Sequence, residues 1–527
     1  MKKRIPFLRQ ITTFVFLAVF TVTATAQALS PEQTDKLVEK TMATFNVPGI
    51  AVAIVKDGKI IHMKGYGVSS IKSGEKTNEN TLFAIASNSK AFTSAALGIL
   101  VDEGKLSWNS KVIDFIPEFR LYSPYVTEEF TIKDLLTHRS GLGLGAGDLM
   151  IWPDGASFTL QEIIHNMRYL KPVSGFRTKY DYDNLLYIVA GEVVSRISGM
   201  SWAAFVEKRI MDPLKMTRSA GSYDNLKDKS NVAASHVEVE GKLQVVPMSL
   251  NNSANAAGGI FSSVADMSRW VIMQLNRGKY GENLEKTLLS PMVHQELWTP
   301  QTIIPIRGKT TYKMHFRSYG LGWGISDVNG YKMVTHTGGL SGALTQVTLI
   351  PDLNLGIIVF TNQQIGEAFT SITNTILDSY FGITGTDRVA DNLASLIQAT
   401  TNASQVTDGI WKVVDANKSN GITGPKLEIL TGTFRDNWFG DVKISAKDGK
   451  LLFASEKSPK ILGEMFFYKG STFIVKWFNR SFDADSYANF TFDNQGVASG
   501  FTMLAISPLT DFSYDFHDLN FVKNEDY

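Results

Sequence analysis

Runs of residues that favour β-strands lie at both ends of the first 380 residues of this chain, and helical patterns fill the sequence between them. Residues 49–55 and 59–65 flank an Asp57-Gly58 dipeptide, which is typical of a hairpin turn. Three further β-type runs lie at 331–336, 344–350 and 355–361. The pattern predicts an α+β domain, in which a mixed or antiparallel sheet is flanked by helices and carries a helical insertion.

The character of the sequence changes after about residue 385. Residues 385–425 are polar and partly helical, which indicates a helical connector. Residues 426–527 alternate in short runs between turn signals such as Asp448-Gly449. This pattern of short alternating runs predicts a small all-β, barrel-like domain at the C-terminal end, with a sandwich as the alternative.

The first 28 residues have the features of an export signal. Basic residues precede the apolar run FVFLAVF at 14–20, which is too short to span a bilayer, and the sequence AQA at 26–28 fits a cleavage site. The alternative is a buried first helix. We expect cleavage to leave a periplasmic or secreted bacterial protein with no membrane anchor. The predicted divisions are a signal peptide (1–28), the α+β domain (29–384), the connector (385–425) and the β domain (426–527).

The composition narrows the classes of partner. The chain has 52 basic and 51 acidic residues, so it offers no electrostatic reason to expect nucleic acid or an anionic membrane as a partner. It has no cysteine, which excludes disulfides, thiol catalysis and cysteine-based metal sites. We expect a small-molecule or peptide substrate, and neither a cofactor nor a metal.

The tetrapeptide SNSK at 87–90 stands where an apolar segment enters an amphipathic helix. Positions i and i+3 share a helix face, so Lys90 can direct its amine at the Ser87 hydroxyl. A serine is a weak nucleophile until a base removes its proton, and burial must lower the Lys90 pKa for the amine to be that base. The alternative for Ser87 is an ordinary helix cap. The same spacing recurs at Ser69/Lys72 and Ser73/Lys76.

A second candidate element is Tyr182-Asp183-Asn184, which precedes the strong helical pattern LLYIVAGEVV. Tyr182 can move a proton, and the amide of Asn184 can orient an acyl substrate. The alternatives are an aromatic contact and an asparagine helix cap. The Tyr-x-Asn spacing recurs at Tyr223/Asn225 and Tyr487/Asn489.

The third element, His336-Thr337-Gly338-Gly339, follows a β-like run and precedes another strand. His336 and Thr337 on a strand edge can bind a substrate carboxylate or carbonyl. Gly338 and Gly339 allow a substrate to lie close to the backbone, and an amide near Gly339 can complete an oxyanion hole.

In this order, Ser-x-x-Lys, Tyr-x-Asn and His-Thr-Gly resemble the motifs of the serine β-lactamase and penicillin-binding-protein superfamily. The tyrosine of the second motif is similar to that of the class C β-lactamase and D,D-carboxypeptidase branch. The resemblance covers roughly 35–380. The C-terminal β domain is similar to small β domains that follow the catalytic domain in some exported relatives. Three further stretches resemble serine hydrolases of this branch: TIKDLLTHRSGL at 131–142, AAGGIFSSVADMSRW at 256–270 and YGLGW at 319–323.

The resemblance implies a role for each matching position. Ser87 would be the acylated nucleophile, and Lys90 and Tyr182 would share the general acid and base work. Asn184 would contact the substrate amide. The backbone amides of Ser87 and Gly339 would form the oxyanion hole, and the third motif would line the far side of the site.

The third motif departs from the superfamily pattern, because it begins with histidine where β-lactamases and carboxypeptidases have lysine. A neutral imidazole holds a carboxylate less strongly than an ammonium does, and the pattern is more similar to esterases and D-aminopeptidases. We expect His336 to charge at lower pH and then to favour carboxylate ligands. The resemblance implies an exported serine hydrolase acting on D-amino-acid (cell-wall-like) peptides or esters. A β-lactamase and a non-catalytic penicillin-binding-like sensor are the alternatives.

Overall fold

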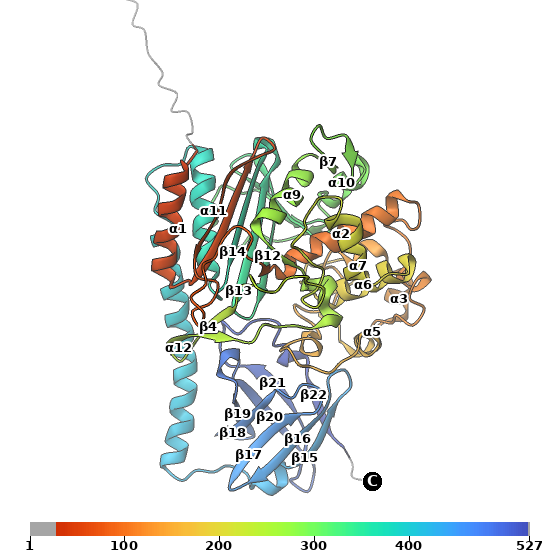
Figure 1. Ribbon diagram of the computed structural model, residues 1–527. Helices are drawn as coiled ribbons and strands as arrows, with labels where there is room; N and C mark the ends of the chain where they lie inside the picture. Colours follow the sequence, from red (N-terminus) through yellow and green to blue (C-terminus); the bar gives the residue numbers. More distant parts are fainter. Residues whose placement is uncertain (1–27, 525–527) are drawn as a thin grey trace, which may run out of the picture.

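An eight-stranded sheet forms the centre of the first domain in the computed structural model, which describes residues 28–524 (Figure 1). The predicted signal peptide lies outside these residues, except for its last position. Neighbouring strands are antiparallel throughout, in the order β2-β1-β14-β13-β12-β11-β10-β9. The strands are β1 (Gly49–Lys56), β2 (Lys59–Gly67), β9 (Thr302–Ile303), β10 (Arg317–Tyr319), β11 (Gly324–Val328), β12 (Tyr331–Leu340), β13 (Ala343–Ile350) and β14 (Leu355–Thr361).

Both faces of the sheet are apolar, because successive side chains along a strand point to opposite faces. In β1, Ile50 and Val52 belong to the core on one face, and Ala51 and Ala53 to the core on the other. The first face is covered by two helices from opposite ends of the domain (Figure 1). These are α1 (Pro31–Phe45) and α11 (Gly366–Phe381).

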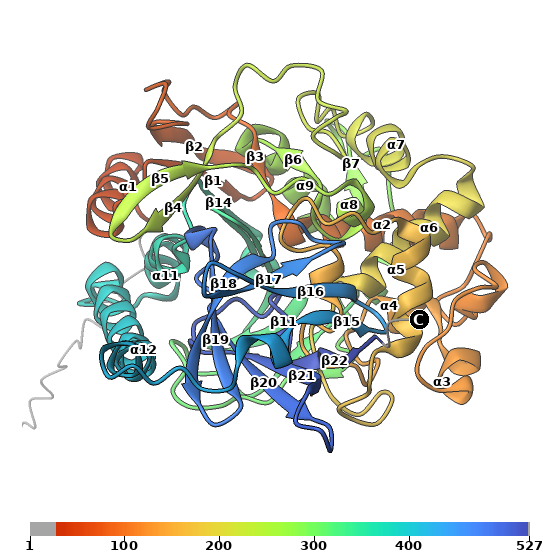
Figure 2. The same cartoon turned by 90° about the horizontal axis from the view of Figure 1, so that it is seen from below.

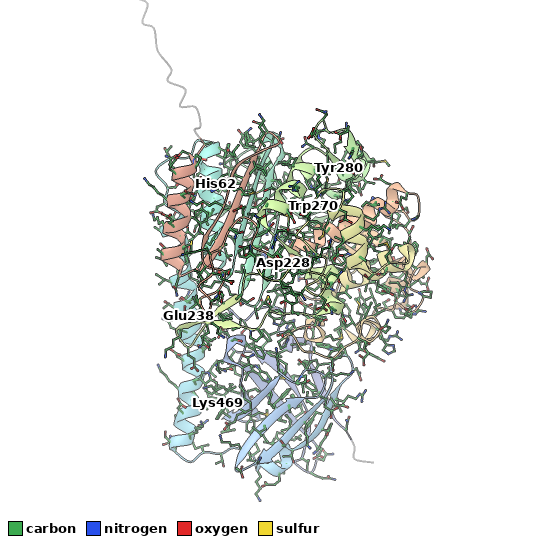
Figure 3. The ribbon with its side chains drawn as sticks, in the orientation of Figure 1. His62, Asp228, Glu238, Trp270, Tyr280 and Lys469 are labelled. Carbon is green, nitrogen blue, oxygen red and sulfur yellow. The ribbon has the colours of Figure 1, made fainter. Side chains whose placement is uncertain are left out.

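The helical insertion covers the second face, and α2 runs through its interior. Every residue of α2 from Ser89 to Leu100 is buried, so the helix is enclosed on all sides, whereas the sequence pattern indicated an amphipathic helix. Trp270 of α9, labelled in Figure 3, stacks on Phe92 of α2 with ring centroids 4.0 Å apart. The main helices are α2 (Ser89–Asp102), α6 (Leu185–Ser198) and α9 (Val264–Leu275).

The outer edge of β12 is open over its second half. β11 pairs with β12 only between Tyr331 and Thr335, whereas β13 continues to pair with β12 as far as Leu340. The third sequence motif occupies this open stretch. A substrate can therefore approach the backbone of β12 beyond Thr335 without displacing a strand.

The C-terminal domain is a closed antiparallel barrel of eight strands. The long helix α12 (Arg388–Ser419) leads to it and runs beside both domains (Figure 1). The apolar core of the barrel is continuous with the core of the helical layer, and seen from below the barrel lies across that layer (Figure 2). Its strands are β15 (Gly432–Asp436), β16 (Gly440–Lys447), β17 (Lys450–Ser455), β18 (Leu462–Lys469), β19 (Thr472–Trp477), β20 (Ser486–Phe492), β21 (Ala498–Ala505) and β22 (Asn520–Lys523).

The predicted fold class is confirmed in both parts, with an antiparallel rather than a mixed sheet and a barrel rather than a sandwich. Among residues 28–524, no helix combines the length and the apolar character that a bilayer-crossing segment requires.

Candidate active site

Ser87 lies in a one-turn 3₁₀ helix, Ala86–Asn88, directly before α2. Thr345 of β13 binds this turn to the sheet: its hydroxyl accepts a hydrogen bond from the Asn88 side-chain nitrogen Nδ2 and donates one to the Ile85 carbonyl oxygen, both at 2.9 Å. Ala86 has a φ of 48°, in the left-handed region that non-glycine residues rarely adopt. These contacts hold the half-buried Ser87 at the edge of a cavity of about 490 Å³.

Lys90 is fully buried, and its amine is held by three oxygen atoms. Nζ lies 3.0 Å from Ser87 Oγ, 2.7 Å from Asn184 Oδ1 and 2.9 Å from the Ala257 carbonyl oxygen. Burial lowers the pKa of Lys90 to about 7, although the nearby carboxyl groups of Asp148 and Asp183 act in the opposite direction. The amine can therefore accept the Ser87 proton near neutral pH.

Asn184 links Lys90 to a buried acid that the motifs did not indicate. While Oδ1 accepts from Lys90, Nδ2 donates to Asp148 Oδ2 at 2.7 Å. Both ends of the amide are engaged within the protein, whereas the resemblance implied a contact with the substrate. Asn184 still lines the cavity, and its side chain is hydrogen-bonded to Lys90 and Asp148.

Tyr182 packs between Lys90 and a group of aromatic rings. The amine of Lys90 lies 4.8 Å from the centroid of the Tyr182 ring, and the ring of His138 lies 4.3 Å from it. Burial raises the pKa of Tyr182 well above its usual value, and a hydrogen bond with Ser87 opposes this shift. Tyr182 is thus a neutral phenol beside the Ser87 hydroxyl, suited to pass a proton rather than to hold a charge.

His336 is buried, and both of its ring nitrogens have partners in the protein. Nε2 lies 2.8 Å from the Tyr319 hydroxyl, and Nδ1 lies 2.6 Å from the Thr337 carbonyl oxygen. Burial lowers the pKa of His336 to about 3, and the positive charge of Lys90 contributes to the shift. The expectation that His336 charges at mildly acidic pH and then binds carboxylates is therefore wrong.

The two glycines of the third motif bring β12 close to the Ser87 turn. A Cβ atom on Gly338 would lie 2.1 Å from the Ile85 carbonyl oxygen, so no side chain fits there. Gly339 lies on the open edge of β12 and lines the cavity together with Ser87 and Thr337. Ser87 and Gly339, whose backbone amides are predicted to form the oxyanion hole, thus both line the cavity.

The barrel supplies part of the cavity surface, which the sequence did not predict. Asp511, Phe512 and Ser513, from the loop between β21 and β22, line the cavity. The Phe512 ring packs edge-on against the Tyr182 ring, with centroids 5.7 Å apart. Farther along the same loop, Asp515 accepts a hydrogen bond from the Gly147 amide at 2.6 Å. The cavity is therefore built jointly by the two domains.

The structure brings all eight predicted site residues to this cavity or directly beneath it. Four residues to which sequence reasoning assigned no role also lie here: His138, Asp148, Asp183 and Tyr319. Asp183 is the middle residue of the second motif, and His138 and Tyr319 lie within TIKDLLTHRSGL and YGLGW, two stretches quoted for the resemblance. One group in residues 28–524 has spacing suitable for metal ligands, and it lies in the barrel: Asp515, His517 and Asp518.

The fold and the site together define the class of this protein: an α+β domain of the β-lactamase and penicillin-binding-protein type, with a serine–lysine pair at the start of a buried helix. The chain belongs to the beta-lactamase family, whose sequence profile matches residues 34–379. Residues 418–523 match a family described as a domain of unknown function, DUF3471.

Curated relatives and a solved structure resemble this chain. "Unguisins hydrolase ungD" of Aspergillus violaceofuscus is 28% identical over 376 residues, which cover 67% of this chain and 65% of the relative. "Protein flp" of Staphylococcus aureus is 27% identical over 338 residues, or 63% of each protein. The chain thus spans less than two thirds of their length. The octameric penicillin-binding protein homologue from Pyrococcus abyssi shares the fold, with a TM-score of 0.59 and 20% identity over 94% of this chain and 100% of that one.

Proposed function

We propose that this protein is an exported serine hydrolase of the class C β-lactamase and D,D-carboxypeptidase branch, which acts through an acyl-enzyme on Ser87. Lys90 and Tyr182 take the proton from Ser87 as its oxygen attacks the substrate carbonyl. The amides of Ser87 and Gly339 stabilise the oxyanion, and the proton then passes to the leaving group. Water releases the acyl group in a second step that uses the same groups.

One observation carries the proposal. The amine of Lys90 lies 3.0 Å from Ser87 Oγ, and its pKa is lowered to about 7 by burial. A serine beside an exposed, permanently charged lysine would lack a base, whereas this lysine is largely neutral just above neutral pH. The relatives named as unguisins hydrolases support hydrolysis as the class of reaction.

The proposed substrates are D-amino-acid-containing, cell-wall-like peptides or esters. The neutral His336 supports these over β-lactams, because the third motif supplies no cation for the carboxylate that such drugs carry. The export signal expected at 1–28 supports a location in the periplasm or outside the cell. No nucleic acid or membrane partner is proposed.

The test is covalent labelling followed by turnover. A fluorophosphonate probe should acylate the wild-type protein, and Ser87→Ala should abolish labelling without changing the circular dichroism spectrum. Ser73→Ala, which removes an exposed serine of the same Ser-x-x-Lys spacing, is the matched control and should label normally. Labelling that persists in Ser87→Ala would overturn the assignment.

Turnover separates an enzyme from a sensor. Purified protein should be screened against D-aminoacyl peptides, muropeptide fragments, short esters and a chromogenic cephalosporin. Multiple turnovers of a peptide or ester support the proposal, whereas stoichiometric acylation without release would indicate a penicillin-binding-like sensor. Rapid turnover of the cephalosporin alone would indicate a β-lactamase.

A further inference from the structure

A buried carboxylate in the barrel has one oxygen atom without a partner. Asp515, in the loop between β21 and β22, is fully buried, and its Oδ2 accepts the hydrogen bond from the Gly147 amide. Its other oxygen, Oδ1, is also shielded from solvent but accepts no hydrogen bond. Burying a carboxylate oxygen without a donor is costly, so this atom requires a cation or a proton beside it.

Two further groups that can bind a metal lie around this oxygen. Asp515, His517 and Asp518 each offer one ligand atom, and these atoms lie within 4.8 Å of one another. Nδ1 of His517 lies 3.3 Å from Oδ1 of Asp515, although the two atoms form no hydrogen bond. Ligand atoms about 2.0–2.2 Å from a tetrahedral zinc ion lie about 3.3–3.6 Å from one another, which matches this pair. Oδ2 of Asp518 is likewise shielded from solvent without a hydrogen-bond partner.

The negative charge of this group is not balanced by a basic side chain. Within residues 28–524, neither Asp515 nor Asp518 forms an ion pair with a lysine or arginine, and Lys171 acts on Asp518 only from farther away. The buried Asp148 adds a like charge from the side of the first domain. A divalent cation offsets two carboxylates, and the His517 side chain, which is 45% exposed, leaves such an ion a route from solvent.

We propose that Asp515, His517 and Asp518 bind a zinc ion that fastens the barrel to the first domain. One imidazole and two carboxylates suit zinc, whereas calcium and magnesium prefer oxygen ligands alone. Water would complete the coordination. This inference replaces the expectation, drawn from the sequence, that the protein binds no metal. It concerns the structure rather than the catalysis and does not rest on the proposed function.

Hydrogen bonds join the proposed zinc ligand Asp515 to the residues beneath the active site. Asp515 accepts from the amide of Gly147, and the next residue, Asp148, accepts from Asn184, which in turn binds Lys90. A zinc ion that orients Asp515 therefore stabilises the contact between the barrel and the loop under Lys90. Because this contact exists only in the folded molecule, zinc should raise the melting temperature.

The experiment measures zinc binding to the full chain, with any affinity tag removed and metal stripped by a chelator. Calorimetric titration with zinc chloride should give one site per chain, and saturating zinc should raise the Tm by about 2 °C or more. His517→Ala and Asp518→Asn should each raise the Kd for zinc about tenfold or more, since loss of even an outer-shell partner of a metal costs that much. Both variants should also lose the rise in Tm.

A second histidine supplies the matched control. His315 is also exposed and lies 2.7 Å from a carboxylate oxygen, that of Asp327, but this pair has no third ligand among the described residues. His315→Ala should therefore keep the wild-type Kd and Tm shift.

Stability without metal separates loss of binding from unfolding. Asp518→Asn removes a negative charge beside the buried Asp515, so in metal-free buffer its Tm should be at least that of wild type. The absence of saturable zinc binding in wild type, or a Kd that is unchanged in both His517→Ala and Asp518→Asn, would overturn the inference. Either result would indicate that Asp515 and Asp518 share a proton instead.

Discussion

The hydroxyl of Tyr319 lies 2.8 Å from Nε2 of His336 and thereby occupies the nitrogen that would otherwise face a ligand. Nδ1 lies 2.6 Å from a carbonyl oxygen, that of Thr337, which can only accept. The ring is therefore the neutral tautomer with its proton on Nδ1, and it accepts the Tyr319 hydrogen. This arrangement removes a charge from the position where related enzymes of the superfamily carry lysine.

The first prediction concerns His336. Because its pKa lies near 3, the ring should stay neutral from pH 5.5 to 8.5, and the preference for acidic over neutral esters should not titrate near pH 6.5. His336→Gln, which is neutral and can still accept from Tyr319, should give the same pH dependence of that preference. The measurement is kcat/KM for an ester that carries a carboxylate, divided by kcat/KM for a matched neutral ester, across this pH range. A step near pH 6.5 in wild type that disappears in His336→Gln would contradict the neutral tautomer.

The second prediction concerns the base. Since burial lowers the pKa of Lys90 to about 7, kcat/KM for a neutral ester should rise about tenfold for each pH unit below 7 and level off above it. Lys90→Met should lower kcat/KM by about a hundredfold or more, because general-base assistance is worth that much. The rate of fluorophosphonate labelling should follow the same curve. Labelling that is independent of pH between 5.5 and 9 would show that Lys90 is not the base.

The third prediction concerns the buried acids beneath Lys90. Asp148 and Asp183 raise the pKa of Lys90 only while they are ionised, and burial raises the pKa of both acids. Asp148→Asn and Asp183→Asn should therefore each move the acid limb of the kcat/KM profile to lower pH by a small amount. Glu192→Gln, on the partly exposed side of α6, is the control, and its kcat/KM should depend on pH as that of the wild type does.

The raised pKa of Asp183 also predicts how the stability of the folded state depends on pH. Burial raises its pKa from 3.8 to about 7, so the folded state binds more protons than the unfolded state between these values, and stability falls as the pH rises through that window. An asparagine can still accept the Leu186 amide hydrogen bond that Asp183 Oδ1 accepts. Asp183→Asn should therefore raise the Tm by about 2 °C or more at pH 8, and by less at pH 4. Equal effects at both pH values would mean that Asp183 is not buried in its charged form.

The fourth prediction concerns the surface that the barrel contributes. Phe512→Ala removes a ring that packs against Tyr182 and lines the cavity, so it should change kcat/KM for bulky acyl donors by about tenfold relative to acetyl esters. Phe512→Ala should lower the free energy of unfolding by less than about 1 kcal/mol, since Phe512 is 37% exposed. Phe478→Ala, which removes a 56% exposed barrel ring outside the cavity, is the matched control and should not change the selectivity. Equal selectivity in all three proteins would mean that the barrel only supports the fold.

The fifth prediction compares the two glycines of the third motif. A Cβ on Gly338 would meet the Ile85 carbonyl oxygen at 2.1 Å, so Gly338→Ala must displace the turn that carries Ser87. We expect a loss of about 2 kcal/mol or more of stability and loss of labelling. A Cβ on Gly339 meets only the end of the Leu344 side chain, at 3.1 Å, and Gly339→Ala should cost under about 1 kcal/mol. Thermal unfolding and labelling of the two variants test this difference.

Local patterns were sufficient for part of the site. The Ser87–Lys90 pair follows from helix geometry alone, because residues three apart share a helix face. The strands at both ends of the first domain, and the change to alternating runs after the connector, predicted the α+β domain and the β domain from periodicity. Both the Ser-x-x-Lys and the Tyr-x-Asn spacings occur three times in the chain. The order of the three motifs indicated which of these occurrences belong to one site.

The sequence by itself thus determined the elements, the two domains and the residues able to do the chemistry. Only the tertiary structure decided how those residues are charged and what surrounds them. The pKa values of Lys90 and His336 depend on burial, and burial results from the enclosure of α2 by the helices around it and from the packing of Tyr319 against His336. No local pattern marks Phe512 or Arg317 as part of the cavity, because a loop of the barrel and the short strand β10 reach it only after the chain has folded. Charge and proximity across such distances are properties of the packed molecule, and neighbouring residues in the sequence do not encode them.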